Sequence, residues 1–163
     1  MRIRADEHVS PPIVRWIREL GLSAGWQLTS VREEGHDGDP DITWVTKFAR
    51  DGGEAILSAD KDFLKRPQQI VAICDTGLRV IHMPPRWANS IRSIQAAHIL
   101  FWWHKIEATL VSSKPRQFWR VPWGFADSPL TLQKVDYEDS RRRLKKAQRR
   151  SGDTVPHKQG NEG

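Results

Sequence analysis

The clearest structural signal in this sequence is Glu54-Ala55-Ile56-Leu57-Ser58-Ala59-Asp60-Lys61-Asp62-Phe63. Its first five residues predict a short strand, and two acidic residues follow soon after that strand. The start of the chain has a similar arrangement, because a strand predicted at residues 2–5 runs into Asp6 and Glu7. Sites in α/β proteins form beyond the carboxyl ends of the parallel strands. The sequence therefore predicts that these acidic side chains converge at one edge of a sheet.

Strands and helices alternate along the chain, separated by short loops. The predicted strands are residues 2–5, 27–31, 54–58, 78–83 and 118–121. The predicted helices are residues 11–20, 41–49, 67–74 and about 90–111, with 139–150 as a basic helix or arm. Residues 70–73 fit a strand equally well. This alternation predicts an α/β domain with a mainly parallel sheet.

Several residues mark where the predicted helices begin and end. Ser10 stands before two prolines, and this predicts a helix start, because serine can cap a helix and proline is tolerated in its first turn. Gly21 predicts the end of that helix. Asn89 or Ser90 is expected to cap the long helix that ends near Val111.

The composition of the 163 residues excludes several classes of protein. An apolar fraction of 38% with eight Trp is sufficient for a core, which excludes a wholly disordered chain. The single cysteine, Cys74, excludes a disulfide framework and a cysteine-based zinc site. The N-terminus lacks the apolar core of a signal peptide, and no run of about 18 apolar residues predicts a membrane span. We therefore expect a soluble, cytoplasmic protein.

The charges are unevenly distributed along the chain. Residues 141–163 hold eight Lys and Arg against two acidic residues, so this tail accounts for the whole formal net charge of +6. Within the remainder, residues 1–62 carry a net charge of −4 and residues 63–140 carry +4. A carboxylate-rich half beside a basic half suits a protein that holds metal ions and approaches a polyanion.

Each acidic residue also has an ordinary structural explanation. Asp41 alone is typical of a helix cap, Asp60 and Asp62 of an acidic turn, and the acids of residues 33–39 of a solvated loop. Taken together, acids at two strand ends and at a neighbouring helix start would repel one another. A hard divalent cation relieves that repulsion, and Mg²⁺ binds a few carboxylates while it keeps several waters. The joint pattern therefore predicts a Mg²⁺ site.

Three blocks of this sequence resemble the PIN-like nuclease family. The first block is Arg4-Ala5-Asp6-Glu7-His8-Val9-Ser10, which is similar to the Asp-Glu-Asn opening of that family. The second is Asp41-Ile42-Thr43-Trp44 with Phe48-Ala49-Arg50-Asp51-Gly52-Gly53, and the third is Ile56-Leu57-Ser58-Ala59-Asp60-Lys61-Asp62-Phe63-Leu64. The resemblance covers about residues 1–83 and is closest to the VapC-like toxin branch.

The resemblance implies a fold and an activity. The fold is a Rossmann-like α/β/α sandwich, here followed by a Trp-rich helical extension and the basic tail. The implied activity is that of a Mg²⁺- or Mn²⁺-dependent ribonuclease with one or two metal ions. Such proteins are commonly the toxin paired with an antitoxin protein and are often dimeric, so RNA, an antitoxin and a second copy are the expected partners.

The resemblance also implies which residues form the site. The four acids that match the catalytic and metal-binding positions of the family are Asp6, Asp41, Asp60 and Asp62. Ser58 stands where the family usually has threonine, and it would hydrogen-bond a metal ligand or water. Glu7 is expected to support the site. Asp39 is the alternative to Asp41, since the two lie only two residues apart.

The resemblance and the charge pattern divide the chain into two parts. Residues 1–140 are expected to form the nuclease domain with its extension, and residues 141–163 a basic, largely disordered tail. This tail is as consistent with contact to a polyanion as with a role in solubility alone. The RNA-binding candidates within it are Arg141, Arg142, Arg143, Lys145 and Lys146.

Other aromatic and histidine residues are weaker candidates. His8 stands beside two acids, but it is more typical of a surface histidine. Trp102-Trp103 favours a core or a dimer interface over a base-stacking platform, whereas Trp119 and Trp123 fit RNA stacking and packing equally. The alternative function is a non-catalytic nucleic-acid- or partner-binding module that retains the PIN-like fold. The presence of all four acids favours the enzyme.

Overall fold

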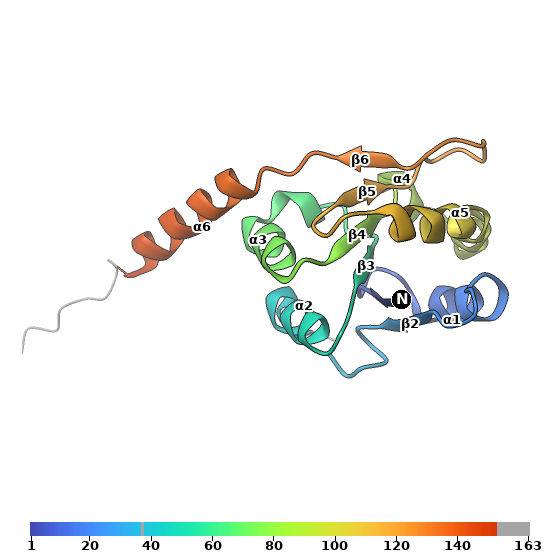
Figure 1. Cartoon of the computed structure of the whole chain (residues 1–163), viewed down its shortest axis with the longest axis horizontal. Helices are drawn as coiled ribbons and strands as arrows, with labels where there is room; N and C mark the ends of the chain where they lie inside the picture. The colour runs from blue at the N-terminus through green and yellow to red at the C-terminus, as the bar shows by residue number, and fades with distance from the viewer. Residues whose placement is uncertain (37, 153–163) are drawn as a thin grey trace, which may run out of the picture.

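A computed structural model describes residues 1–36 and 38–152, and within them six strands form one sheet between two layers of helices (Figure 1). The strands are β1 (Arg2–Ala5), β2 (Gln27–Ser30), β3 (Ala55–Ser58), β4 (Arg79–His82), β5 (Phe118–Arg120) and β6 (Thr131–Gln133). The helices are α1 (Pro11–Leu20), α2 (Asp41–Arg50), the 3₁₀ turn η1 (Phe63–Lys65), α3 (Pro67–Thr76), α4 (Pro85–Ala88), α5 (Arg92–Ser112) and α6 (Tyr137–Gly152). This architecture confirms the predicted α/β fold.

The sheet is parallel except at one edge. Its strand order is β2-β1-β3-β4-β5-β6, and only β6 runs antiparallel, against β5. Strands β1 and β3 are direct neighbours, with Ala5 opposite Leu57. The carboxyl ends of these two strands therefore lie side by side at the same edge of the sheet, where the acidic residues follow.

One layer of helices contains α1 and the Trp-rich helix α5. Ile13 and Ile17 of α1 pack with Trp102 and Ile106 of α5 in a core cluster that also contains Leu57 of β3. All of these side chains are buried. The tryptophan pair expected in the core or at a dimer interface therefore belongs to the core.

The other layer contains α2 and α3. Val45 and Phe48 of α2 pack with Ile73 of α3 and with Ile56 of β3 in a second core cluster. Successive side chains of a strand point to opposite faces, so Ile56 and Leu57 face different layers and β3 is buried on both sides. Gly77 ends α3 with φ of 77°, in the left-handed region that glycine adopts without strain.

The structure resolves the alternative for residues 70–73 and corrects the expected cap of the first helix. Residues 70–73 lie inside α3 and are helical. Ser10 occupies the cap position of α1, but its hydroxyl caps no backbone N–H group. The physical reason is that Pro12 has no N–H, while the next donor, Ile13 N, already bonds the Ser10 carbonyl at 2.9 Å.

The start of the long helix also differs from the prediction. Helix α5 begins at Arg92 with Ile91 as its cap residue, so neither Asn89 nor Ser90 caps it. A separate short helix, α4, precedes it and buries Trp87. The Trp87 Nε1–H donates to the Gln95 carbonyl and the Gln95 amide donates back to the Trp87 carbonyl, both at 3.0 Å. This exchange folds α4 against the start of α5.

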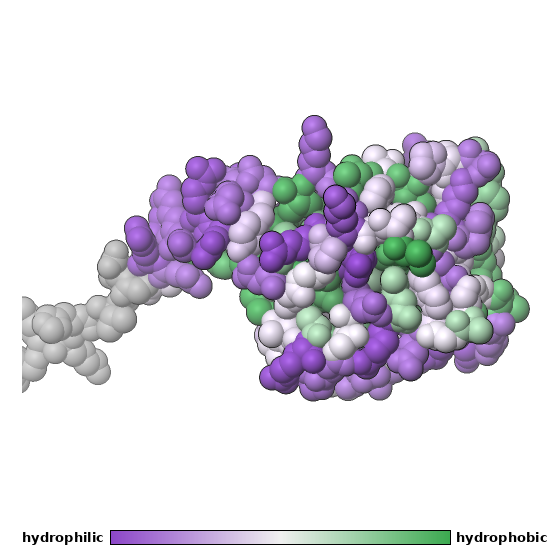
Figure 2. Space-filling view, in the orientation of Figure 1, coloured by the Kyte–Doolittle hydropathy of each residue, from purple (hydrophilic) through white to green (hydrophobic). Residues whose placement is uncertain are grey.

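The chain ends in a basic helix that projects from the sandwich. Helix α6 contacts α3 near its own start, where the Tyr137 hydroxyl donates to Asp75 at 2.6 Å, and it then extends away from the domain (Figure 1). Its visible surface is strongly hydrophilic (Figure 2). The tail expected from residue 141 is helical through Gly152, and residues 153–163 lie outside the described residues. No helix in the described part of the chain is long and apolar enough to cross a membrane.

Candidate active site

The acidic residues meet at the carboxyl edge of the sheet. Asp6 directly follows β1, and its backbone N–H donates to the Leu57 carbonyl of β3 at 2.9 Å. Asp60 lies two residues after β3. Both side chains are buried, so the topology places two carboxylates from distant segments under one part of the surface.

Asp6 is held by donors from three residues, one on the loop after β1 and two at the end of β3. Its Oδ1 accepts the backbone N–H of His8 at 3.0 Å and that of Ala59 at 3.5 Å, and its Oδ2 accepts the Ser58 hydroxyl. The His8 Nδ1 lies 3.8 Å from the same Oδ2. These contacts fix the orientation of the carboxylate before any ligand binds.

Burial dominates the electrostatics of Asp6. It raises the pKa of this carboxyl from 3.8 to about 6, although the hydrogen bond from Ser58 and the proximity of His8 act in the opposite direction. A carboxyl with a pKa near 6 is ionised at neutral pH, but burial makes its ionised form less favourable than it is in water. A bound cation would offset this effect of burial.

Ser58 joins the two acidic segments. Its hydroxyl donates to Asp6 Oδ2 and accepts the backbone N–H of Asp60 at 3.2 Å. Because the hydroxyl is both donor and acceptor, one small side chain holds the ends of β1 and β3 in register. These two contacts place Ser58, which was predicted to support the site, between Asp6 and Asp60.

Asp60 is held from its other side by backbone and histidine contacts. Its Oδ1 accepts the Asp62 N–H at 2.9 Å, and its carbonyl lies 2.7 Å from His82 Nε2. Burial lowers the pKa of His82, and its Nδ1 faces the Arg120 guanidinium at 3.4 Å. A neutral ring that donates through Nε2 and accepts at Nδ1 satisfies both partners.

Asp41 reaches the same region from the start of α2. Its Oδ1 accepts the Trp44 indole N–H at 3.2 Å, and its Oδ2 accepts the side-chain amide of Gln69 from α3. Asp41 is the first residue of α2, and its carboxylate does not cap that helix. Packing of α2 against α3 therefore directs this side chain toward the sheet edge.

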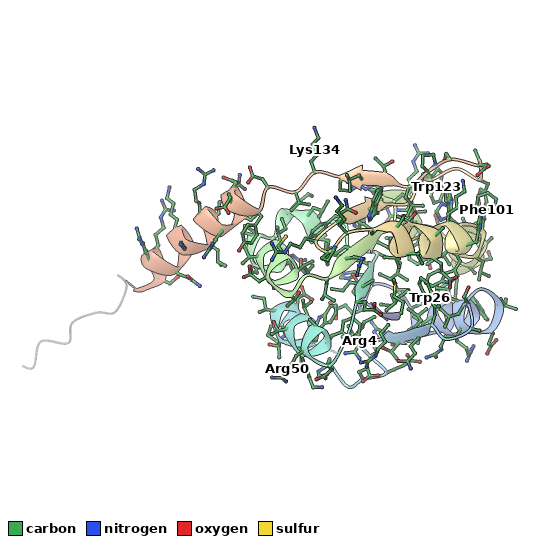
Figure 3. The ribbon with its side chains drawn as sticks, viewed as in Figure 1. Arg4, Trp26, Arg50, Phe101, Trp123 and Lys134 are labelled. Atoms are coloured by element: carbon green, nitrogen blue, oxygen red, sulfur yellow. The ribbon has the colours of Figure 1, made fainter. Side chains whose placement is uncertain are left out.

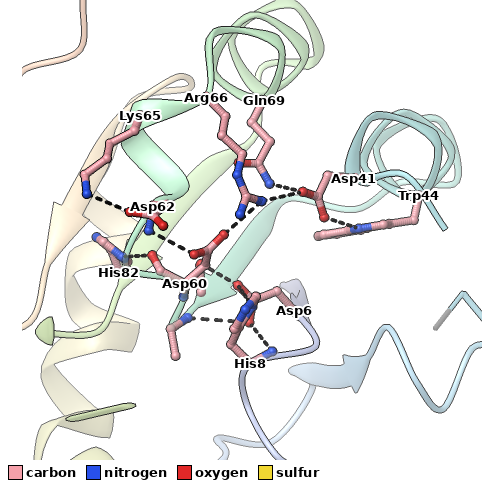
Figure 4. A network of polar contacts seen from close by, with 12 residues as sticks. Asp6, His8, Asp41, Trp44, Asp60, Asp62, Lys65, Arg66, Gln69 and His82 are labelled. Carbon is pink, nitrogen blue, oxygen red and sulfur yellow. Dashed lines mark hydrogen bonds and ion pairs between the residues drawn. The ribbon is translucent and has the colours of Figure 1, made fainter. Parts of the chain in front are cut away.

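A guanidinium lies between Asp41 and Asp60. The Nη1 of Arg66 is 3.1 Å from Asp60 Oδ2 and 3.4 Å from Asp41 Oδ2 (Figure 4). Arg66 is the residue that precedes α3, so the start of this helix brings a positive charge to the acidic edge. Asp41 and Asp60 are thus connected through Arg66.

A cavity of about 290 Å³ opens next to Asp60. Its lining comes from the loop after β1, the turn after β3, the start of α3 and the end of α4. The lining residues are His8, Ala59, Asp60, Lys61, Asp62, Arg66 and Ala88. The cavity provides access from solvent to a carboxylate that is otherwise buried.

Three of the predicted acids lie outside this convergence. The Asp62 side chain is 53% exposed and pairs with Lys65 at 2.6 Å, an interaction that lowers its pKa. Glu7 is exposed. Asp39 pairs with His36 at 2.8 Å, on the loop before α2. Of the two alternatives for the second acid, Asp41 is the one that shares a partner with Asp60.

The donor set suits a hard divalent cation. Carboxylate oxygens of Asp6, Asp41 and Asp60 are the ligands that Mg²⁺ prefers, and Mg²⁺ needs only one or two of them together with waters. Within residues 1–36 and 38–152, no three His, Cys, Asp or Glu side chains lie close enough together to hold a metal ion. Arg66 supplies the positive charge between Asp41 and Asp60, so an ion that binds both must displace it.

The geometry agrees with a comparison against known protein families. A family described as PIN-like domain matches residues 1–85, just over half of the chain. The chain belongs to the PIN-like domain family. The match includes β1 to β4 and every predicted site acid. No curated protein and no solved structure matches the chain.

The part beyond the PIN-like match contains most of the aromatic and basic candidates. Trp102 and Trp103 are buried, and their indole N–H groups donate to the Gly124 carbonyl and to Glu107, both at 2.9 Å. Trp123 stacks on His98 with 5.2 Å between the ring centroids, near Phe101 at the end of the molecule opposite α6 (Figure 3). These tryptophans therefore contribute mainly to packing.

The basic candidates all lie on α6 and are exposed; they are Arg141, Arg142, Arg143, Lys145 and Lys146. Arg142 and Arg143 pair with Asp139 at 3.5 and 2.7 Å, and Arg141 lies over the Tyr137 ring. A helix that carries this many exposed cations presents a concentrated positive surface to solvent.

Sequence reasoning missed Arg66 and Gln69, which contact the acids of the candidate site. The predicted helix start at Pro67 offered one signal, because it places the residues just before it near the acidic turn after β3. Their contacts with Asp41 depend on how α2 packs against α3. Nothing in the local sequence specifies that packing.

Proposed function

We propose that this PIN-like protein is a Mg²⁺-dependent endoribonuclease that acts as the toxin of a toxin–antitoxin pair. The observation that carries the proposal is the arrangement of Asp6 and Asp60. They are buried beyond adjacent parallel strands and are linked through Ser58 beside a cavity. Burying two carboxylates is costly unless cations compensate them, so this arrangement favours a cation-binding role.

In this proposal Asp60 and its neighbours Asp6 and Asp41 supply one or two carboxylate ligands to Mg²⁺ or Mn²⁺, and waters complete the coordination shell. When bound, such an ion stabilises charge on the scissile phosphate and lowers the pKa of an attacking water. Ser58 and the backbone N–H groups of His8 and Asp62 keep the carboxylate oxygens oriented. These donors are already in place, so the rearrangement that ion binding requires is the departure of Arg66 from Asp41 and Asp60.

The charge distribution supports RNA as the substrate class. The exposed cations of α6 suit the phosphate backbone of a polyanion, and Lys61 lines the cavity beside Asp60. The proposed antitoxin is a protein that covers this cavity and inserts a Lys or Arg side chain toward the carboxylates. Such a charged pair, once desolvated, would compete with the metal.

A second candidate function is a non-catalytic binding module that retains the PIN-like fold. The observation that favours it is the pair of contacts from Arg66 to Asp41 and Asp60, which neutralise carboxylates that an ion would otherwise bind. The two candidates differ in one measurable property, which is cleavage of RNA that depends on a divalent cation and on Asp60.

The test is RNA cleavage by the purified protein with Mg²⁺ and with EDTA, together with growth of cells that express it. We expect wild type to cleave only with Mg²⁺ and to arrest growth, and co-expression of its antitoxin to restore growth. Asp60→Asn should reduce cleavage by about 10²-fold or more, because it removes a charge from a preorganised site. It should also abolish growth arrest.

Two further aspartates provide the comparison. Asp127→Asn changes a side chain on an exposed loop that pairs with Lys105, so we expect wild-type cleavage. Asp62→Asn should reduce cleavage less than Asp60→Asn, because its side chain points into solvent toward Lys65. RNA cleavage that survives both EDTA and Asp60→Asn would contradict the proposed function, and no cleavage by wild type would favour the binding module.

A further inference from the structure

Arg66 is more exposed than either of the two carboxylates it contacts. Asp60 is buried and accepts the Asp62 N–H at 2.9 Å, while Asp41 is held by Trp44 and Gln69. By contrast, the Arg66 side chain is 41% exposed and ends a long, flexible stem. Both carboxylates therefore have hydrogen-bond partners besides Arg66, whereas the exposed guanidinium can exchange its contacts with them for water.

The backbone around Arg66 fixes where its side chain starts. Arg66 has φ of −98° and ψ of 105°, the extended conformation that a residue before proline prefers, and Pro67 begins α3 directly after it. The Cα of Arg66 is thus anchored at the acidic edge of the sheet.

We propose that Arg66 is a built-in counter-ion of the acidic site, one that must leave Asp60 before a divalent cation can bind there. This inference rests on the proposed metal-dependent function. In the metal-free protein the guanidinium neutralises Asp41 and Asp60, which would otherwise face one another without a cation. An arriving ion competes with it for the same Oδ2 atoms.

The competition has a quantitative consequence. The apparent affinity of a ligand falls by the fraction of molecules in which its site is free. If Arg66 leaves Asp60 in about one tenth of the molecules, metal binding is about tenfold weaker than in a protein without the guanidinium. Removing Arg66 should therefore strengthen metal binding while it weakens the metal-free fold.

The experiment measures Mn²⁺ binding by isothermal titration calorimetry for wild type and Arg66→Gln, with no RNA present. We expect Arg66→Gln to bind Mn²⁺ about tenfold more tightly, because the competing cation is absent. We also expect its melting temperature without metal to fall, and the increase in melting temperature at saturating Mn²⁺ to exceed that of wild type.

The matched control is Arg18→Gln. Arg18 lies on α1, is 36% exposed and pairs with Glu33 at 2.6 Å, so this variant loses an arginine ion pair of similar exposure away from the site. It should bind Mn²⁺ as wild type does. Arg66→Lys keeps the charge without the planar guanidinium, and we expect its affinity to exceed that of wild type and to stay below that of Arg66→Gln.

Two results would overturn the inference about Arg66. One is an Mn²⁺ affinity of Arg66→Gln, or of Arg66→Lys if the former does not fold, that is no tighter than that of wild type. The other is an equal gain in Arg18→Gln, which would indicate a general effect of net charge. If wild type cleaves RNA with Mg²⁺ in either case, only the counter-ion role fails. If no variant binds Mn²⁺ and wild type cleaves nothing, the proposed function fails as well.

Discussion

At the scale of single residues, the Asp6 carboxyl should make the stability of the fold depend on pH. Its burial raises the pKa to about 6, and the hydrogen bond from Ser58 limits that rise. In an unfolded chain the same carboxyl has a pKa near 3.8. Between these two values the folded protein binds more protons than the unfolded chain does. Deprotonation of Asp6 consequently works against the metal-free fold.

The sign of this effect gives a testable pH dependence. The contribution of Asp6 to the free energy of unfolding should fall as pH rises from about 4 to about 6. For a rise in pKa from 3.8 to about 6, this decrease is at most about 3 kcal/mol. Asp6→Asn cannot ionise, so the variant should lack this decrease. Urea unfolding with EDTA between pH values of about 4 and 7 measures the difference.

The control for this pH dependence is Glu7→Gln. Glu7 is the next residue and is exposed, so its variant should follow wild type across the pH range. Mg²⁺ should reverse the trend in wild type, because it stabilises the ionised carboxyl. Equal pH dependence of stability in Asp6→Asn and wild type would show that burial does not raise the pKa of this carboxyl.

At the scale of secondary-structure elements, helix α5 is attached to the rest of the domain by a buried acid. Glu107 accepts the backbone N–H of Ser23 and the indole N–H of Trp103, both at 2.9 Å, and also the Ser23 hydroxyl. Ser23 lies in the connection between α1 and β2. The Trp-rich helix is thus tied to that connection by the two donors of Ser23, while the Trp103 indole of the same helix orients the carboxylate.

Replacing Glu107 should destabilise the whole domain. Glu107→Ala leaves buried donors without acceptors, and we expect a loss of about 2–4 kcal/mol in the free energy of unfolding. As a control, Glu19→Ala removes an exposed glutamate of α1 and should change the free energy of unfolding by less than about 0.5 kcal/mol. Urea denaturation measures both values.

A measurement of Mn²⁺ binding distinguishes the structural role of Glu107 from a role in the candidate site. Because α5 lies in the same layer as α1, whereas Asp41 and Arg66 belong to the layer of α2 and α3, folded Glu107→Ala should bind Mn²⁺ as wild type does. An unfolding free energy equal to that of wild type would show that the three hydrogen bonds are compensated by water.

At the scale of the whole molecule, positive and negative charge are spatially separated. Asp6, Asp41 and Asp60 lie at the carboxyl edge of the sheet, and the exposed cations belong to α6, which extends from the domain (Figure 1). Lys145, Lys146 and Arg149 are exposed members of this helix. This separation favours a role for α6 in capturing substrate and a separate role for the carboxylates in chemistry.

Removing the basic segment should change substrate capture alone. We expect deletion of residues 141–163 to raise the KM for RNA and to leave kcat nearly unchanged, since contacts made equally in ground and transition states do not raise kcat. Each lost phosphate contact should flatten the dependence of log K on log salt by about 0.7 for a single strand. Cleavage kinetics at several salt concentrations measure both effects.

A substitution variant tests the charge of α6 without removing the helix. Replacing Lys145, Lys146 and Arg149 with Gln should raise KM in the same direction as the deletion does. If both variants keep the KM and the salt dependence of wild type, α6 contributes to solubility and not to RNA binding. A deletion that also converts a dimer into a monomer would indicate that the helix docks on a second copy of the chain.

Much of this protein is determined by local sequence. Periodicity, prolines and glycines predicted the strands of the parallel sheet and the main helices, because each element has its own pattern of apolar residues. The positions of Asp6 and Asp60 beyond neighbouring strands followed from the rule for parallel sheets. Strand β6 and helix α4 were not predicted, since each is only three or four residues long and is stabilised by its neighbours.

Only the tertiary structure decided how the side chains of the site are paired. Asp60 and Asp62 are two residues apart, yet one is buried and the other points to Lys65, because the chain turns at residues 61–62, just before η1. The position of Arg66 between Asp41 and Asp60 depends on the packing of α2 against α3. Local patterns specify which residues lie at an element's end, whereas the pairing of charges depends on distances between elements that only the packed core sets.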